Sequence, residues 1–218
     1  MGRTGRCGTE RDAGATSPMV GQAVTTRGVV TAVYATGGLD GYCVQTPGAG
    51  GRFDPGAHDA SEAIFVHSPD TAGTVRPGQY VEVTGAVAEY HGRTRISVRA
   101  DGLRVLDEPA EAVKPTVVGW PAEEAEREDL GGMLLDPAGE FVITDNDDLN
   151  RYGEIGLAAG ATPLFQPTAV GAPGSAEAAA QAADNEARGV LLDDGATTDY
   201  GSFANAAIPL PRAPSGSS

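Results

Sequence analysis

Hydrophobic and polar residues alternate over the first half of the chain, in short runs separated by glycine, proline and aspartate. A period of two is typical of β-strands with one buried face. The runs are also rich in β-branched and aromatic residues, which strands favour. Five runs have this pattern: VTTRGVVTAVY (24–34), GYCVQT (41–46), EAIFVHS (62–68), YVEVTGAVAEY (80–90) and RTRISVRADGLRVL (93–106). We therefore expect five strands in this half.

The first and fourth runs each contain one internal glycine, Gly28 and Gly85. A strongly bent barrel strand needs a bulge or a close backbone approach at such a point. Five strands with two kinks predict an all-β fold with a five-stranded OB-fold barrel, a small and partly open barrel, over residues 19–108.

Alternation also predicts the direction of each side chain. The aliphatic sets fill the barrel, and they include Ile64, Val66, Val81, Val83, Val87, Ile96 and Val98, with Tyr42 beside Val44. The opposite set points outward and consists of Cys43, Gln45, Phe65, His67, Arg93, Arg95 and Ser97. Any function of the barrel surface depends on this outward set.

Residues 109–218 have a different composition and charge. Their net charge is −13, whereas residues 1–108 carry only −2. The stretch 109–120 is rich in Pro, Ala and Glu and predicts a linker. We expect residues 121–210 to form a smaller acidic accessory region, mostly β, with a short helix.

Short apolar runs and capping residues give the elements of this second region. EFVITD, EIGLA and GVLLDDG predict short strands, and a short acidic helix is expected near residues 121–130. A further helix should begin after Ser175 as its N-cap and end before Gly189. By composition, residues 1–18 predict a disordered leader and residues 211–218 a linker remnant.

The sequence offers no recognisable catalytic constellation. The histidines, His58, His67 and His91, have no neighbours at metal-ligand spacing. The acidic run TDNDDLN (144–150) lacks the turn glycine of a calcium loop, which favours a solvated turn. Neither a G-x-S-x-G elbow nor a phosphate-binding G-x-x-x-x-G-K loop is present. We expect this chain to be non-catalytic, with no cofactor of its own.

The cysteines and the apolar runs bear on the compartment. Cys7 lies in the expected leader and Cys43 in a strand, so we expect no disulfide between them and a filler role for Cys43. No apolar run has the length of a membrane span or of a signal-peptide core. We therefore expect no membrane partner and no export signal within this chain.

The outward-facing side chains of the barrel suggest a binding function more specifically than the rest of the sequence does. Phe65, with Tyr34 or Tyr90 as further platforms, could stack on bases, while Arg27, Arg93 and Arg95 hold phosphates and Gln45 or His67 bonds a base edge. Because the whole chain has a net charge of −15, binding of nucleic acid must depend on this local arginine cluster. The alternative is that Phe65 packs under a loop and the arginines only keep a strand soluble.

Two blocks of the chain resemble a known group of proteins. The first is MVGQAVTTRGVVTAVYATGGLDGYCVQTPG with SEAIFVHSP and PGQYVEVTGAVAEYHGRTRIS. The second is EFVITDNDDLNRYGEIGLAAGATPLFQPTAV with PGSAEAAAQAADNEARGVLLDDG and IPLP. Together they resemble the OB-fold domain and the following region of large secreted bacterial nucleases of the endonuclease/exonuclease/phosphatase type. The resemblance covers residues 18–210, and N-R-Y-G-E with L-D-D-G is its most specific part.

The resemblance implies a secreted, extracellular protein that binds or positions single- or double-stranded DNA weakly for a catalytic nuclease domain. That domain, with its divalent metal, would follow residue 218. There are two departures: Cys43 stands where an aromatic residue is expected, and Gly131 where the family tends to have Glu. The alternative is a structural spacer that packs against the catalytic domain and contacts no nucleic acid. A metal-dependent nuclease in its own right is the third interpretation, and the missing motifs argue against it.

Overall fold

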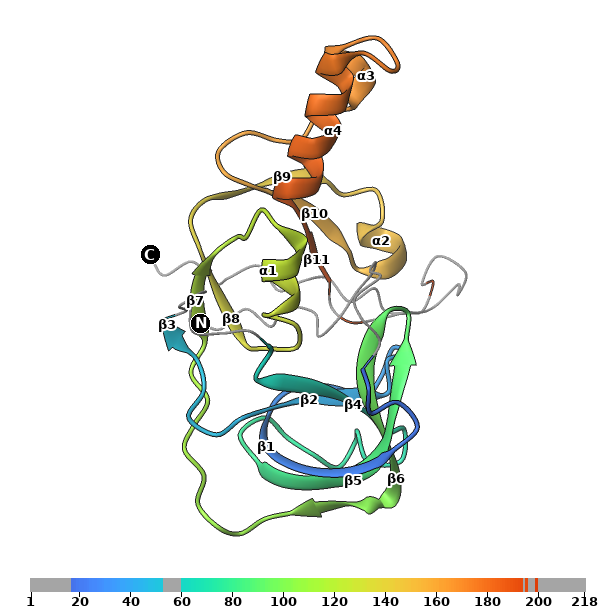
Figure 1. The fold of residues 1–218 in the computed structure, drawn as a ribbon, viewed down its shortest axis with the longest axis vertical. Coiled ribbons are helices and arrows are strands. Elements are labelled where there is room, and N and C mark those ends of the chain that lie inside the picture. The colour runs from blue at the N-terminus through green and yellow to red at the C-terminus, as the bar shows by residue number, and fades with distance from the viewer. Residues whose placement is uncertain (1–16, 53–59, 194, 196–198, 200–218) are drawn as a thin grey trace. The chain divides into compact units, whose positions relative to one another are not determined.

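The computed structural model describes residues 17–52, 60–193, 195 and 199, and the chain divides into two compact units. The first unit contains a closed barrel of five strands (Figure 1). These strands are β1 (Ala23–Tyr34), β2 (Gly41–Gln45), β4 (Ala63–His67), β5 (Tyr80–Tyr90) and β6 (Arg93–Val105). All five lie where the alternating runs predicted them.

The strands neighbour one another in the order β1-β2-β4-β6-β5, and β1 pairs with β5 to close the barrel. All pairs are antiparallel except β4 with β6, which run parallel. Around the barrel, the strands therefore follow the sequence first, second, third, fifth, fourth. This is the Greek-key topology of the OB-fold, so the predicted all-β fold class is confirmed.

Both internal glycines lie where another strand comes close. A Cβ on Gly85 would collide with the carbonyl oxygen of Ser97, and the β5–β6 register shifts between Val83 and Gly85. A Cβ on Gly28 would lie 3.0 Å from the carbonyl oxygen of Gln45. The absence of a side chain at these two positions lets the strands bend into a narrow barrel.

Most of the predicted aliphatic set fills the barrel interior, although Val87 is not part of the central cluster. The buried cluster comprises Val30, Tyr42, Val44, Val66, Ala72, Val75, Val81, Val83, Ile96 and Val98, with Ile64 packed against it. Ala72 and Val75 come from the connection between β4 and β5, which has no alternating pattern and was not predicted to join the core. Burying one aliphatic side chain of this size stabilises a fold by about 1.5–3 kcal/mol, so the cluster holds the barrel together.

The first unit continues beyond the barrel, through residues that were expected to be a linker. β3 (Gly51–Arg52) pairs in parallel with β7 (Thr116–Gly119), and β8 (Leu135–Ala138) joins them in a small sheet. The backbone N–H of Lys114 also donates to the carbonyl of Ala49. Part of the segment 109–120 is therefore strand, anchored to the loop that follows β2. α1 (Glu124–Glu128) lies within the predicted acidic helix.

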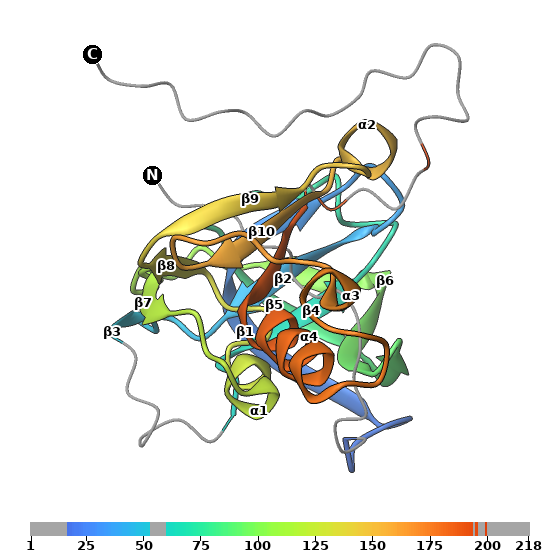
Figure 2. The ribbon, with the colours of Figure 1, turned by 90° about the horizontal axis from the view of Figure 1, so that it is seen from above.

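The described part of the second unit contains a three-stranded antiparallel sheet in the order β11-β10-β9 and three helices. Its elements are β9 (Phe141–Asp145), α2 (Leu149–Tyr152), β10 (Ile155–Ala159), α3 (Pro167–Val170), α4 (Ala176–Arg188) and β11 (Gly189–Leu192). The three strands and α4 were predicted, whereas the short helices α2 and α3 were not. α3 lies beside α4 (Figure 2).

The longest helix, α4, has the predicted ends. Ser175 adopts an extended conformation and its hydroxyl accepts a hydrogen bond from the backbone N–H of Ala178, which satisfies one free donor of the first turn. Gly189 follows directly and begins β11. At the same end, Arg188 binds both carboxylate oxygens of Asp184 and the carbonyl of Ala159, which ties the helix to the end of β10.

Cys43 corrects one expectation. It is 1 % exposed and disulfide-bonded, so the prediction of no bridge is wrong. The other cysteine of the sequence, Cys7, lies outside the described residues, as does most of the expected leader. Alternation and the spacing of the cysteines in the sequence gave no sign that Cys43 is bonded. Among the described residues, no helix is long and apolar enough to cross a membrane.

Candidate nucleic-acid interface

The outward side chains of three neighbouring strands, β4, β6 and β5, share one face of the barrel. Residues paired directly across a sheet point to the same side. One row of this face is Phe65, Arg95 and Ala88, and the next is His67, Ser97 and Ala86. The structure thus places Phe65, His67 and Arg95 together. The small side chains of Ser97, Ala86 and Ala88 lie between or beside these three.

A tight turn at the end of the β5–β6 hairpin completes this face. His91 and Gly92 form the turn, and both have positive φ, 50° and 75°. Two such residues in a two-residue loop match the twist of the flanking strands. The turn places Tyr90 opposite Arg93, which makes Arg95 the diagonal neighbour of Tyr90.

The Arg95 guanidinium lies over the Tyr90 ring, with its central carbon 4.1 Å from the ring centroid. The His91 ring meets the Tyr90 ring edge-on, with centroids 4.3 Å apart and an angle of 84° between the planes. Tyr90 is still 52 % exposed. The hairpin end therefore presents an exposed aromatic ring that is held in place by a cation.

Unlike Arg27 and Arg104, Arg95 has no acidic partner within the described part of the chain. It is half-buried, its Nε has no hydrogen-bond partner, and burial lowers the pKa of its guanidinium. A guanidinium has five donors arranged to meet phosphate or carboxylate oxygens. An anion that reached Arg95 would find a partly desolvated cation whose donors are not already used.

His67 lies beside Arg95 on the same face and is half-buried. Burial and the positive charge of Arg95 lower the pKa of its imidazole, and the negative charge of Asp40 opposes that shift. His67 is therefore neutral at neutral pH. In that form it can donate one hydrogen bond and accept another.

Phe65 is both a packing residue and part of the face. Its ring lies over Gly41, where a Cβ would collide with the ring and with the carbonyl oxygen of Val66. It packs against a small outer cluster of Ala32, Tyr34 and Cys43, together with Leu39. One side of Phe65 is thus engaged, which fits the packing interpretation, but the residue remains half-buried at the surface. Tyr34, expected as a further platform, is only 9 % exposed.

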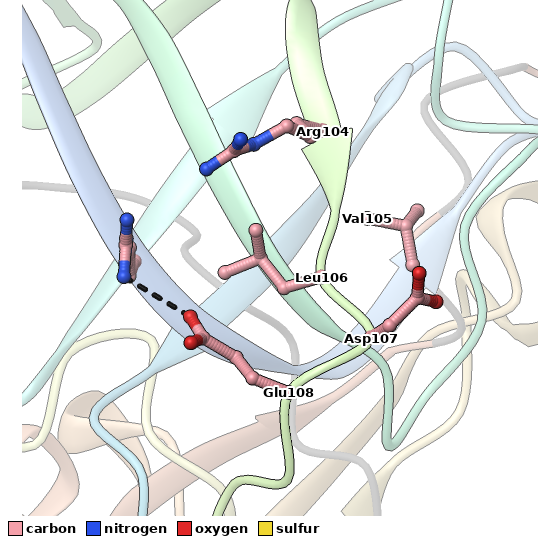
Figure 3. A pocket seen from close by; sticks show the side chains of 6 residues that line it. Arg104, Val105, Leu106, Asp107 and Glu108 are labelled. Atoms are coloured by element: carbon pink, nitrogen blue, oxygen red, sulfur yellow. Dashed lines mark hydrogen bonds and ion pairs between the residues drawn. The ribbon is translucent and has the colours of Figure 1, made fainter.

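Arg27 lies elsewhere and already has partners. Its Nε donates to Glu82, 2.7 Å away, and its Nη1 to Glu108, 3.0 Å away. The hydrogen bond from Arg27 is the main reason that the pKa of Glu82 is lowered. Arg104 binds the other oxygen of Glu82. Arg27, Arg104 and Glu108 line a shallow pocket together with Val105, Leu106 and Asp107 (Figure 3). Its carboxylates neutralise the arginines, so it does not favour a phosphate.

Gln45 corrects a second expectation. The side chain points outward from the barrel, as alternation predicted, but it is 1 % exposed rather than accessible. Its Oε1 accepts a hydrogen bond from the backbone N–H of Leu134, while the carbonyl of Leu134 accepts from Thr116. The segment that carries Leu134 covers this end of β2. Gln45 therefore serves to anchor that segment and cannot reach a ligand.

Sequence reasoning ranked Tyr90 below Phe65, although a usable signal was present. The dipeptide His91–Gly92 between two alternating runs is a turn signal, and a two-residue turn fixes which residues face each other. Combining the turn with alternation places Tyr90 within reach of Arg95 across the hairpin. Arg93, half-buried at the same end, also belongs to this face, as predicted.

The acidic run of the second unit forms a turn. The Asp145 carboxylate accepts a hydrogen bond from the backbone N–H of Asp147, and α2 follows directly. Across the residues that the structure describes, no group of three His, Cys, Asp or Glu side chains could hold a metal ion.

Comparison with known proteins identifies no family for this chain. No protein-family model and no curated protein matches the chain. Among solved structures, it is similar to a chain of a replication protein A heterotrimer bound to single-stranded DNA, with 21 % identity and a TM-score of 0.28 over 41 % of this chain and 60 % of that one. It is also similar to the hypothetical protein ygiW from E. coli, with 20 % identity and a TM-score of 0.28 over 45 % of this chain and 98 % of that one. The OB-fold assignment rests on the strand order and register described above.

Proposed function

We propose that the barrel binds single-stranded nucleic acid on the outer face of β4 and β6 and at the end of the β5–β6 hairpin. The observation that carries this proposal is Arg95, a half-buried guanidinium that is stacked on exposed Tyr90 and paired with no carboxylate of the described residues. Proteins that hold single strands combine aromatic platforms with cations that follow the phosphates.

The chemistry divides between the two kinds of side chain. Tyr90 offers an exposed ring on which a base can stack, and stacking contributes about 1–3 kcal/mol per base. Arg95 and Arg93 offer donors to the neighbouring phosphates, and His67 offers a hydrogen bond to a base edge or a phosphate oxygen. A single strand suits this arrangement better than a duplex, because only unpaired bases can leave their stack to reach a ring.

The charge of the whole protein limits how tightly this face can bind nucleic acid. A net charge of −15 repels a polyanion at long range, so the few cations of this face must supply the attraction at short range. We expect binding that is weak and that weakens further as salt rises, because phosphate contacts release counterions.

Fluorescence anisotropy of a labelled oligothymidylate, titrated with the purified chain at low and at moderate salt, tests the proposal. The expected result is saturable binding with a negative salt slope and no cleavage of the oligonucleotide when magnesium is present. Absence of binding at low salt to single strands, duplex DNA and RNA alike would show that the proposal is wrong.

We further propose that the chain positions nucleic acid for the catalytic domain of an extracellular nuclease. This part rests on the sequence resemblance and on no structural comparison. The N-R-Y-G-E block ends α2, where Gly153 adopts a left-handed conformation with φ of 78° and its N–H donates to the carbonyl of Leu149. That conformation favours glycine and gives one residue of the block a structural role.

A second candidate function is docking to such a catalytic domain without nucleic-acid contact. One observation favours it: Ile143, Leu157 and Val190 form an apolar row across the sheet of the second unit, and Ile143 is 65 % exposed. Calorimetry with a separately expressed catalytic domain of this nuclease type tests the idea. Binding that Ile143→Asp abolishes would support docking, and absence of binding would contradict it.

A further inference from the structure

We infer that a phosphate bound at Arg95 is also held by His67 in its protonated form, so that this face takes up one proton when it binds nucleic acid and binds more tightly in mild acid. The inference rests on the proposed function and adds a regulation to the same site.

The register of the parallel strands carries the first step. Phe65 pairs with Arg95 and His67 pairs with Ser97, so His67 and Arg95 are diagonal neighbours on one face. Diagonal positions lie close enough for long side chains to share a ligand. A single phosphate with several acceptor oxygens can therefore meet the guanidinium and the imidazole together.

The charges around His67 carry the second step. Arg95 faces it from β6 and disfavours its proton, while Asp40, next to Gly41 at the start of β2, favours the proton. The uncharged Ser97 is its direct neighbour on β6, and the β5–β6 hairpin adds Arg93 and His91 to the same end of the face. In the free protein, burial and Arg95 prevail over Asp40, and the imidazole is neutral.

A bound phosphate reverses this balance. Its negative charge offsets that of Arg95 and gives the imidazolium an anionic partner, so the proton becomes favourable. Coupling between two ligands is reciprocal, so the proton must strengthen phosphate binding by the same factor. With one proton taken up, the affinity rises at most about tenfold for each unit that the pH falls, within the window between the free and bound titration points of His67.

His91 is the competing explanation for any pH dependence, because it is a second histidine of this face and contacts the Tyr90 ring. The two histidines lie at different places on the face, so substitutions can distinguish their effects. His67 lies on β4 as a diagonal neighbour of Arg95, whereas His91 lies in the turn that follows Tyr90. The variants His67→Gln and His91→Gln therefore form a matched pair.

The experiment follows the imidazole resonances of the full chain by NMR from about pH 5 to pH 8, alone and with dimethyl phosphate or oligothymidylate. Dimethyl phosphate keeps one negative charge throughout this range and stands for the backbone alone. We expect both ligands to move the His67 titration to higher pH, and we expect Arg95→Ala to abolish the shift. Oligothymidylate affinity should rise as the pH falls in the wild type and in His91→Gln, and should stay nearly constant in His67→Gln.

Three other outcomes would separate the proposed nucleic-acid binding from the proposed proton uptake by His67. If oligothymidylate binds but the titration of His67 does not move, the proton inference is wrong and the proposed function stands. If dimethyl phosphate shifts His67 while no oligonucleotide binds, the phosphate site is real and the nucleic-acid function is wrong. If neither ligand has an effect, both proposals fail.

Discussion

The guanidinium of Arg95 lies 4.1 Å from the centroid of the Tyr90 ring, across the hairpin that joins β5 and β6. The contact brings together the cation and the aromatic ring that a single-strand site needs, and it depends on the two-residue turn at His91 and Gly92. Arg95 and Tyr90 also limit each other's motion, so these two side chains are partly ordered before a ligand binds. Several variants can separate the roles of the two residues.

Tyr90→Ala should weaken binding of oligothymidylate by about 1–3 kcal/mol, because it removes a base platform. Tyr90→Phe should bind nearly as well as the wild type, since the ring remains. Anisotropy at fixed salt measures both variants, and circular dichroism shows whether the exposed substitution leaves the fold intact. Equal affinity of Tyr90→Ala and the wild type would mean that no base stacks on this ring.

Arg95→Ala should make the salt dependence of binding shallower, by about 0.7 in the slope of log K against log salt for each phosphate that the protein no longer neutralises. Arg104→Ala is the matched control, because Arg104 lies on the same strand but is paired with Glu82. The control should bind like the wild type. A weakening of equal size in both variants would indicate a general charge effect, with no specific site at Arg95.

Much of the fold follows from the sequence because alternation and turn residues are local signals. All five barrel strands, most of the core set and the capped helix α4 were predicted from such signals. The failures concern contacts between distant segments. Alternation gave the direction of Gln45 correctly but could not show that Leu134, 89 residues later, covers it. In the same way, nothing local to Arg27 reveals that Glu82 lies opposite it across β1 and β5.

Gln45→Ala should destabilise the first unit by about 1–3 kcal/mol, because the backbone N–H of Leu134 would lose its acceptor in a partly buried place. Gln22→Ala is the control: Gln22 is exposed, and its side chain donates to the carbonyl of Pro18 at the surface. Urea unfolding, followed by circular dichroism, measures both variants. If the two midpoints of unfolding are the same, Gln45 does not anchor the segment.

Reduction of the disulfide at Cys43 should lower the free energy of unfolding, by about 2–4 kcal/mol if the bond behaves like typical native disulfides. The test compares urea unfolding with and without a thiol reductant. The Cys43→Ser variant should already be destabilised and should not respond further to the reductant. Two free thiols per native chain in a thiol assay, with no effect of reductant, would contradict the bond.

Amide NMR shifts of the labelled chain during titration with oligothymidylate locate the ligand without any substitution, so they test the proposed interface more sharply than any variant. We expect the largest changes on Phe65 and His67 in β4, on Tyr90, and on Arg93 and Arg95 in β6. Residues around the Arg27–Glu82 pair should change little. Changes centred on that pair, or a spectrum that excess oligonucleotide leaves unaltered at low salt, would contradict the proposal that this face of the barrel binds nucleic acid.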